Sequence, residues 1–236
     1  MVGFGAAINR GRHWYLAWLF VHPRYQGRGI GRRLLERIWR EERGVVHSLA
    51  TMTYNQQAVG LYSRFGLVPE ALLTLMHVSR SSLIIPPPTK LEVVRDIRPA
   101  DLAWINRLEK EIRGFPHREE WNHWHRDCEF HRILVFRSRS RRVGYGMLTR
   151  RGHLFPIGVA RRSAMRAVLA ESLRFAAASH PEGSEAGFTI ACPSENREAY
   201  RFLHASGFRN EQMLLLMSDA PIGDLRRYIP ANLAVF

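Results

Sequence analysis

Short apolar runs alternate with amphipathic stretches along this chain, and the alternation predicts a mixed α/β fold. Trp14 to Val21 is a run of eight consecutive apolar residues. That is the length of a buried strand and well short of the roughly 20 residues that a membrane-spanning helix needs. Val45 to Thr53 predicts a second strand, and Asn55 to Leu67 predicts a short helix that stops at Gly66.

The second half of the chain continues the alternation. We expect, in order, a strand at Leu91–Ile97, helices from Arg98 to Ile112 and from Glu119 to Arg126, a hairpin of Ile133–Arg137 and Val143–Thr149, a strand at Leu154–Val159, a helix at Ala164–Ala178, a strand at Gly187–Cys192, a helix at Glu195–Ala205 and a strand at Met213–Met217. Strands that alternate with helices in this way form sheets covered by helices.

Three segments recur at one offset of 141 residues: Val2–Gly5 as Val143–Gly146, Asn55-x-x-Ala58 as Asn196-x-x-Ala199, and Gly66-Leu67 as Gly207-Phe208. The common offset indicates a tandem duplication. We therefore expect a first domain over residues 1–80, a stiff Pro-rich linker over 81–90 and a second domain over 91–236.

A glycine-rich loop joins the strand ending at Val21 to the next helix. The segment from Gln26 to Arg32 reads Gln-Gly-Arg-Gly-Ile-Gly-Arg. Glycines let the backbone turn tightly and approach a ligand, and the first amides of a helix have no intrahelical partner. Together with the helix dipole and with Arg28 and Arg33, these amides favour binding of an anion such as a phosphate.

Two common phosphate-binding motifs do not fit this loop. A P-loop needs Lys-Ser or Lys-Thr after its last glycine, and this chain has Arg32-Arg33 there. A dinucleotide-binding fold needs an acidic residue at the end of the next strand, and Val45–Thr53 contains none.

The loop Gln26-x-x-Gly29-x-Gly31 and the helix Asn55–Leu67 together resemble the motifs of the GNAT acetyltransferase superfamily. The resemblance implies a GNAT-like mixed sheet flanked by helices, in two tandem copies, with acetyl-coenzyme A as cosubstrate. It places the pyrophosphate on the loop and the pantetheine arm along a splayed strand at Leu19–His22. The residues it assigns to the coenzyme are Phe20, Val21, Gln26, Gly27, Arg28, Gly29, Ile30, Gly31, Arg32 and Asn55.

The resemblance also implies an N-acetyltransferase in which an amine attacks the thioester directly. Tyr62 matches the tyrosine that protonates the departing thiolate, and a phenol that only packs in the core is the alternative. Backbone N–H groups near Phe20 and Val21 would polarise the thioester carbonyl. His47 is a candidate base, with a satisfied core histidine as the alternative. The acceptor, a small-molecule or peptide amine, stays unidentified.

The second copy departs from the family pattern at both chemical positions. Its strand-to-helix junction, Val159–Met165, contains no glycine, and Leu203 stands where the first copy has Tyr62. We expect a non-catalytic partner domain. The first copy in turn lacks any counterpart of residues 91–142. We expect those elements upstream of Met1, and the alternatives are that they are dispensable or supplied by another chain.

The net charge is +14, and of the 35 basic side chains only Lys90 and Lys110 are lysines. Nucleic-acid surfaces usually mix both types, so the arginine excess favours a genome-wide codon bias over a nucleic-acid-binding function. Three alternatives stay open: a non-catalytic sensor or scaffold that binds coenzyme A, a basic protein associated with RNA or the ribosome, and a homodimer.

Two cysteines, Cys128 and Cys192, cannot build a disulfide framework, so we expect the reducing cytoplasm. The chain start lacks a signal-peptide pattern, and we expect no association with membranes. His123 and His125 lie near Cys128 but point to different sides of a helix, and their spacing matches no zinc motif. We therefore expect no metal.

Overall fold

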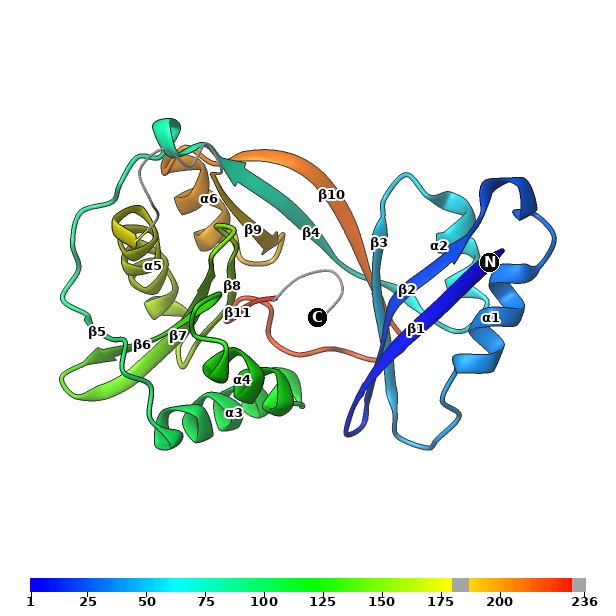
Figure 1. The fold of residues 1–236 in the computed structure, drawn as a ribbon, viewed down its shortest axis with the longest axis horizontal. Coiled ribbons are helices and arrows are strands. Elements are labelled where there is room, and N and C mark those ends of the chain that lie inside the picture. The colour runs from blue at the N-terminus through cyan, green and yellow to red at the C-terminus, as the bar shows by residue number, and fades with distance from the viewer. Residues whose placement is uncertain (180–186, 231–236) are drawn as a thin grey trace. The chain divides into compact units, whose positions relative to one another are not determined.

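The computed structural model describes residues 1–179 and 187–230 (Figure 1). The chain forms two compact units, and neither is one continuous segment. The first consists of Met1–Leu72 and Leu214–Ile222, and the second of Leu73–Met213 with the described residues 223–230. No helix in these described ranges is long and apolar enough to cross a membrane.

The first unit contains one mixed sheet and two helices. Its strands are β1 (Gly3–Arg10), β2 (His13–Val21), β3 (Val46–Met52) and the C-terminal half of β10 (Arg209–Ser218). β1 and β2 form an antiparallel hairpin, β2 and β3 run parallel, and β10 returns antiparallel to β3. Parallel neighbours need a crossover, which here contains α1 (Ile30–Ile38). The second helix, α2 (Gln56–Ser63), follows β3.

The core of the first unit lies between this sheet and its two helices. It consists of Trp14, Leu16, Leu35, Val45, Leu49, Tyr62, Leu67 and Met217. Trp14 is buried except for 1% of its surface and donates a hydrogen bond from Nε1 to the carbonyl of Ile38 at 3.0 Å. That bond connects β2 to the last turn of α1, which fixes the helix whose first turn follows the glycine loop.

The second unit is larger and holds two groups of strands. One sheet has the order β11-β8-β7-β6-β5, and its strands are β5 (Glu92–Val94), β6 (His131–Ser138), β7 (Arg141–Thr149), β8 (Leu154–Val159) and β11 (Tyr228–Ile229). β9 (Phe188–Pro193) pairs with the second part of β4 (Val68–Val78). The helices are α3 (Pro99–Arg113), α4 (Arg118–Arg126), α5 (Met165–Ser179) and α6 (Arg197–Ala205).

Three short 3-10 turns complete the elements: Pro23–Tyr25, Arg80–Ser82 and Arg162–Ala164. β8 is buried along its whole length, as a central strand of six consecutive buried residues should be. α5 packs on β7 and β8 and buries Met165, Val168, Leu169 and Leu173 against them. The second unit is thereby held by a continuous apolar core.

The two copies exchange their last strands. β4 ends the first copy, yet Leu73–Val78 pairs with β9 of the second unit. β10 ends the second copy, yet Leu214–Ser218 pairs with β3 of the first unit. The two strands carry the same residues at three positions separated by 141: Leu73 and Leu214, Leu75 and Leu216, and Met76 and Met217. Apart from the half-buried Leu75, these six residues are buried in the structure.

The mixed α/β class with helices flanking the sheets is confirmed, and β8 has the predicted bounds. The two copies also share a local geometry. Asn55 precedes α2 with φ −85° and ψ 69°, and Asn196 precedes α6 with φ −84° and ψ 66°. These repeated caps are consistent with a duplication. The division at residues 81–90 stays a prediction about the order of the copies, since strand exchange divides the compact units differently.

Candidate active site

β2 and β3 diverge halfway along their length. Their parallel pairing stops at the pair Leu16–Leu49, although β2 continues to Val21 and β3 to Met52. Beyond that pair, β2 keeps β1 as its neighbour on one side and has no strand on the other within the described structure. Strand backbone without a ladder partner is available to an extended ligand. The segment Leu19–His22, predicted for the pantetheine arm, lies at the open end of this divergence.

The loop after β2 reaches α1 through two glycines with left-handed backbone. φ is 74° at Gly27 and 73° at Gly29, and Gly29 is the residue that caps the first turn of α1. A Cβ placed on either glycine would meet nothing within 4 Å. The space beside the loop is therefore open, and glycine is required by the backbone conformation rather than by crowding.

The amides of this loop face no internal acceptor. The amide of Gln26 donates to the carbonyl of Pro23 at 3.2 Å, and the amide of Arg33 donates to the carbonyl of Gly29 at 3.1 Å. Between them, the amides of residues 27–32 donate no backbone hydrogen bond within the described part of the chain. Such a cluster at a helix start is satisfied by water or by an anionic ligand.

Side chains hold the entrance of the loop in place. Gln26 donates from Nε2 to the carbonyl of Val21 at 3.0 Å, which closes the loop onto the end of β2. The Nδ1 of His22 accepts from the amide of Arg24 at 3.2 Å. Gln26 is predicted to contact the coenzyme, and its side chain also holds the loop against the end of β2.

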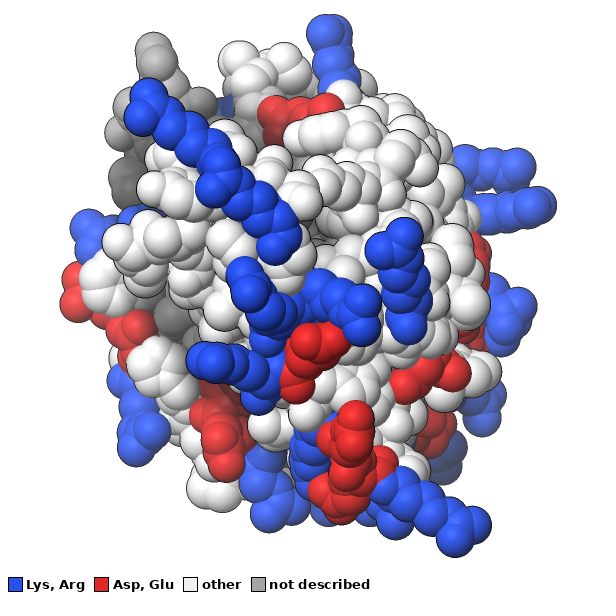
Figure 2. All heavy atoms as spheres, turned by 90° about the vertical axis from the view of Figure 1, so that its right-hand side faces the viewer, with Lys and Arg blue, Asp and Glu red and all other residues white. Residues whose placement is uncertain are grey.

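Positive side chains surround the loop and α1. Five arginines between His22 and Ile38 are exposed, namely Arg24, Arg28, Arg32, Arg33 and Arg37, and Glu36 is the single acidic residue in that segment. Arg32 pairs with Glu36 at 2.8 Å, and the guanidinium of Arg28 lies 5.5 Å from the ring centroid of Tyr25. Figure 2 shows arginine and lysine side chains projecting over this face, with acidic side chains between them. The charge favours an anionic ligand.

Asn55 caps the N-terminus of α2, the helix that follows β3. Its Oδ1 accepts from the amide of Ala58 at 3.1 Å, which caps the first turn of α2. The cap places α2 directly after the open end of β3. Whether Asn55 also lies beside a coenzyme arm stays a prediction.

Tyr62 packs on the inner face of α2, in the core of the first unit. Only 7% of its surface is exposed, and it lies in one cluster with Leu35, Leu49 and Leu67. Burial raises the pKa of the Tyr62 phenol to about 12. The phenol therefore stays protonated at neutral pH, as a proton donor must. Its burial is equally compatible with a packing role.

The remaining predicted residues lie along the end of β2 and the start of α1. Phe20 is 56% exposed, and its ring lies 5.3 Å from that of Phe4 on β1. Val21 and Ile30 are half-buried. A Cβ on Gly31 would lie 3.6 Å from Leu61 Cδ2, so this glycine lies where α1 meets α2.

Both ring nitrogens of His47 contact other groups of the protein. Its Nδ1 lies 2.6 Å from Asp219 Oδ2, and its Nε2 lies 2.9 Å from the carbonyl oxygen of Arg40. Its ring stacks on Trp39 at a centroid distance of 4.1 Å. Both nitrogens lie within hydrogen-bond distance of protein groups, so neither is open to an incoming amine in this geometry. The satisfied-histidine alternative fits this geometry.

Sequence reasoning missed Asp219, which also accepts from the amide of His47 at 2.9 Å. The two residues stand 172 positions apart, and Asp219 comes from the segment that follows the exchanged strand β10. No local pattern signals such a pair.

The equivalent positions of the second unit carry other residues. Leu203, in the place of Tyr62, is completely buried. Tyr200 lies one turn earlier and accepts a hydrogen bond at its hydroxyl from Asn210 at 2.7 Å. The junction of β8 and α5 is a 3-10 turn over Arg162–Ala164.

Comparisons with known proteins agree with this geometry. Residues 1–68 match the family model of the acetyltransferase (GNAT) domain. None of the curated proteins matches the chain in sequence. Among solved structures, a candidate acetyltransferase from Pyrococcus horikoshii superimposes with a TM-score of 0.75 and 20% identity, over 100% of this chain and 76% of that chain.

Two further solved structures have related names. A GCN5-related N-acetyltransferase from Sphaerobacter thermophilus has a TM-score of 0.64 and 17% identity, over 100% of this chain and 80% of that chain. A glucosamine N-acetyltransferase region of a fungal GH3 β-N-acetylglucosaminidase has a TM-score of 0.65 and 18% identity, over 92% of this chain and 31% of that chain. At these identities the likeness concerns the fold. The family match covers residues 1–68, which include both the glycine loop and α2, and the fold is shared with these solved structures along the chain.

Proposed function

We propose that the first unit binds acetyl-coenzyme A and transfers the acetyl group to an amine. The observation that carries this proposal is the divergence of β2 and β3 beside a loop whose amides, from residue 27 to residue 32, donate no backbone hydrogen bond to the described residues. A ligand with a diphosphate and an extended amide-bearing arm matches both features. The loop takes the diphosphate, and the free edge of β2 pairs with the arm.

The protein's main contribution to acetyl transfer is to position the amine next to the thioester. The thioester is already activated, so the amine attacks the acetyl carbonyl, the C–N bond forms and the coenzyme thiolate leaves. Backbone amides near Phe20 and Val21 would stabilise the developing oxyanion. Tyr62 would donate its proton to the departing thiolate, since the phenol is protonated at neutral pH.

The acceptor is a small-molecule or peptide amine in this proposal. A protonated alkyl amine must lose a proton before it attacks. Because His47 is engaged at both ring nitrogens, we propose that water carries this proton away. We also propose the cytoplasm as the compartment, in line with a chain of only two cysteines.

The test is calorimetric titration of the full chain with acetyl-coenzyme A, with Gly29→Glu as the disruptive variant. The added carboxylate enters the anion site and strains the left-handed backbone, so we expect affinity to fall on the order of 100-fold. Gly11→Glu is the matched control, because Gly11 also has a positive φ, 59°, and open space around it, but lies in the β1–β2 turn. No binding by the wild type, or unchanged binding by Gly29→Glu, would refute the cofactor assignment.

A coenzyme-binding sensor without catalysis is the second candidate. The observation that favours it is the engagement of His47, which leaves the first unit without the histidine base considered for it. The two candidates separate on turnover. A sensor binds acetyl-coenzyme A and releases no free thiol in the presence of a panel of amines, whereas an enzyme releases it continuously.

A further inference from the structure

The two units differ in what lies beside their central strands, β2 in the first unit and β8 in the second. Phe4 on β1 and Tyr145 on β7 are equivalent at the offset of 141, and their hairpin partners are Phe20 on β2 and Gly158 on β8. By this register, Ile157–Val159 of β8 corresponds to Leu19–Val21 of β2. That is the stretch proposed to pair with the coenzyme arm in the first unit.

In the second unit this edge is occupied by the chain itself. His153, the residue before β8, forms a parallel bridge with Thr189 of β9. Farther along, β11 pairs antiparallel with β8, with Tyr228 opposite Gly158 and Ile229 opposite Ile157. Tyr228 and Ile229 are completely buried.

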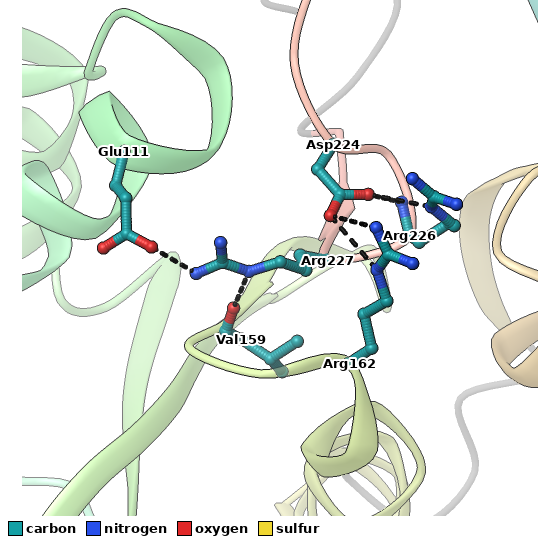
Figure 3. A network of polar contacts seen from close by, with 6 residues as sticks. All are labelled: Glu111, Val159, Arg162, Asp224, Arg226 and Arg227. Carbon is teal, nitrogen blue, oxygen red and sulfur yellow. Dashed lines mark hydrogen bonds and ion pairs between the residues drawn. The ribbon is translucent and has the colours of Figure 1, made fainter.

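The residue before β11 continues the pairing. Val159 donates its amide to the carbonyl of Arg227 at 3.0 Å, and Arg227 returns a hydrogen bond from Nε to the carbonyl of Val159 at 3.1 Å. The other end of the guanidinium binds Glu111 at 2.8 Å (Figure 3). Both backbone groups of Val159 are thus satisfied by a single residue.

A carboxylate lies at the position that matches the glycine loop. Asp224 accepts from Arg162 Nη2 at 2.9 Å and from Nε at 3.2 Å, and Arg162 opens the turn between β8 and α5. Arg226 donates to the other oxygen at 3.1 Å (Figure 3). Partial burial would raise the pKa of Asp224, but the hydrogen bonds from Arg162 and Arg226 outweigh it and lower the pKa. Asp224 therefore presents a stable anion there.

The start of this segment is held by a close approach to α3. Gly223 has φ 101°, and a Cβ on it would lie 2.2 Å from the carbonyl oxygen of Ile112. The amide of Asp224 donates to the same carbonyl at 3.0 Å. Only glycine fits here, so the path of the chain into the edge of β8 is fixed.

We propose that residues 224–229, here called the strap, occupy the coenzyme cleft of the second unit as a built-in substitute for the coenzyme. Asp224 takes the place of the diphosphate, and residues 227–229 take the place of the amide-bearing arm beside β8. The second unit is thereby closed to acetyl-coenzyme A. This inference rests on the proposed function of the first unit, because the comparison defines the cleft.

Stoichiometry is the first test. The full chain should bind one acetyl-coenzyme A, and Gly29→Glu should remove that site and leave none. A stoichiometry of two in the wild type that falls to one in Gly29→Glu would show an open second cleft and overturn the strap proposal. If the wild type binds no acetyl-coenzyme A, the proposed function fails, and the second test alone judges the strap.

Hydrogen exchange is the second test and needs no activity. The amides of Ile157, Val159 and Ile229 should be protected in the wild type and unchanged when acetyl-coenzyme A is added. The double variant Asp224→Ala, Arg227→Ala should raise exchange at these amides by at least tenfold while the first unit keeps its affinity for acetyl-coenzyme A. Asp96→Asn, which changes an exposed carboxylate of the second unit, is the control.

Either of two exchange results would overturn the proposal. One is protection of β8 that increases on addition of acetyl-coenzyme A, which would mean that the coenzyme enters the cleft. The other is unaltered exchange at β8 in the double variant, which would mean that the strap does not hold this edge.

Discussion

Among the described residues, the first unit has no strand on the edge of β2 beyond Leu16, whereas the second unit has β11 on the corresponding edge of β8. The two units also differ at the junction between this strand and the following helix. The first unit has a glycine loop with amides that face no internal acceptor, and the second has a glycine-free turn held by Asp224. Backbone groups left unpaired in a core are costly. A copy without a ligand site must therefore fill its own divergence, and the strap does so.

The largest effect should come from the buried charges of the second unit. Glu109 is completely buried and accepts from the His117 amide at 2.8 Å and from the Tyr145 hydroxyl at 3.0 Å. Glu109→Gln removes the buried anion that faces Arg113 and His117, so we expect a loss of about 3–5 kcal/mol. Urea denaturation measures it. A loss below about 1 kcal/mol would contradict a structural role for this network.

The same residue predicts how stability depends on pH. Burial alone would raise the pKa of Glu109, but the charge and hydrogen bonds of His117, with Arg113, lower it from 4.5 to about 2. A lowered folded pKa stabilises the fold above pH 4.5, and that stabilisation is lost as the pH falls toward 2. Near-ultraviolet circular dichroism of Trp121 and Trp124 should report the acid transition, and Glu109→Gln should flatten it.

Tyr62 tests the catalytic side of the comparison, because the second copy has Leu203 in its place. If the phenol donates a proton, Tyr62→Phe should lower kcat by about 100-fold and leave the KM for acetyl-coenzyme A nearly unchanged. Tyr54→Phe is the control, since Tyr54 is 74% exposed. Equal kcat values for Tyr62→Phe and the wild type would assign Tyr62 to packing alone.

The exchanged strands differ in how they are anchored. In the first unit, the segment after β10 is tied to β3 by Asp219, which accepts from both the amide and the ring of His47. Asp219→Asn removes the charge of this partly exposed carboxylate and should cost about 1 kcal/mol. Exchange should rise in β3 and the C-terminal half of β10, and β11 should not respond. A uniform rise over both units would show that the exchanged strand is not held locally.

Hydrophobic periodicity was enough to predict most elements. The bounds of β8 and the helices α3 to α6 follow from apolar runs and caps, and the glycine loop from its composition. The strand exchange could not be predicted, because β4 and β10 carry the same residues at three equivalent positions and no local pattern distinguishes their partners. The strap could not be predicted either. A strand of two residues is too short to show an alternating hydrophobic pattern, and Tyr228 lies 70 residues from its partner Gly158 in sequence.

The smallest effect should come from the exposed charges. Arg33 lies in the first turn of α1, is exposed, and is not ion-paired in the described structure. Arg33→Ala should weaken acetyl-coenzyme A binding about two- to fivefold at low salt, and the difference should shrink as salt screens it. Arg161→Ala is the matched change at the closed junction of the second unit. It should leave affinity unchanged, because the strap and not a coenzyme lies there, and a loss equal to that of Arg33→Ala would mean that only overall charge attracts the ligand.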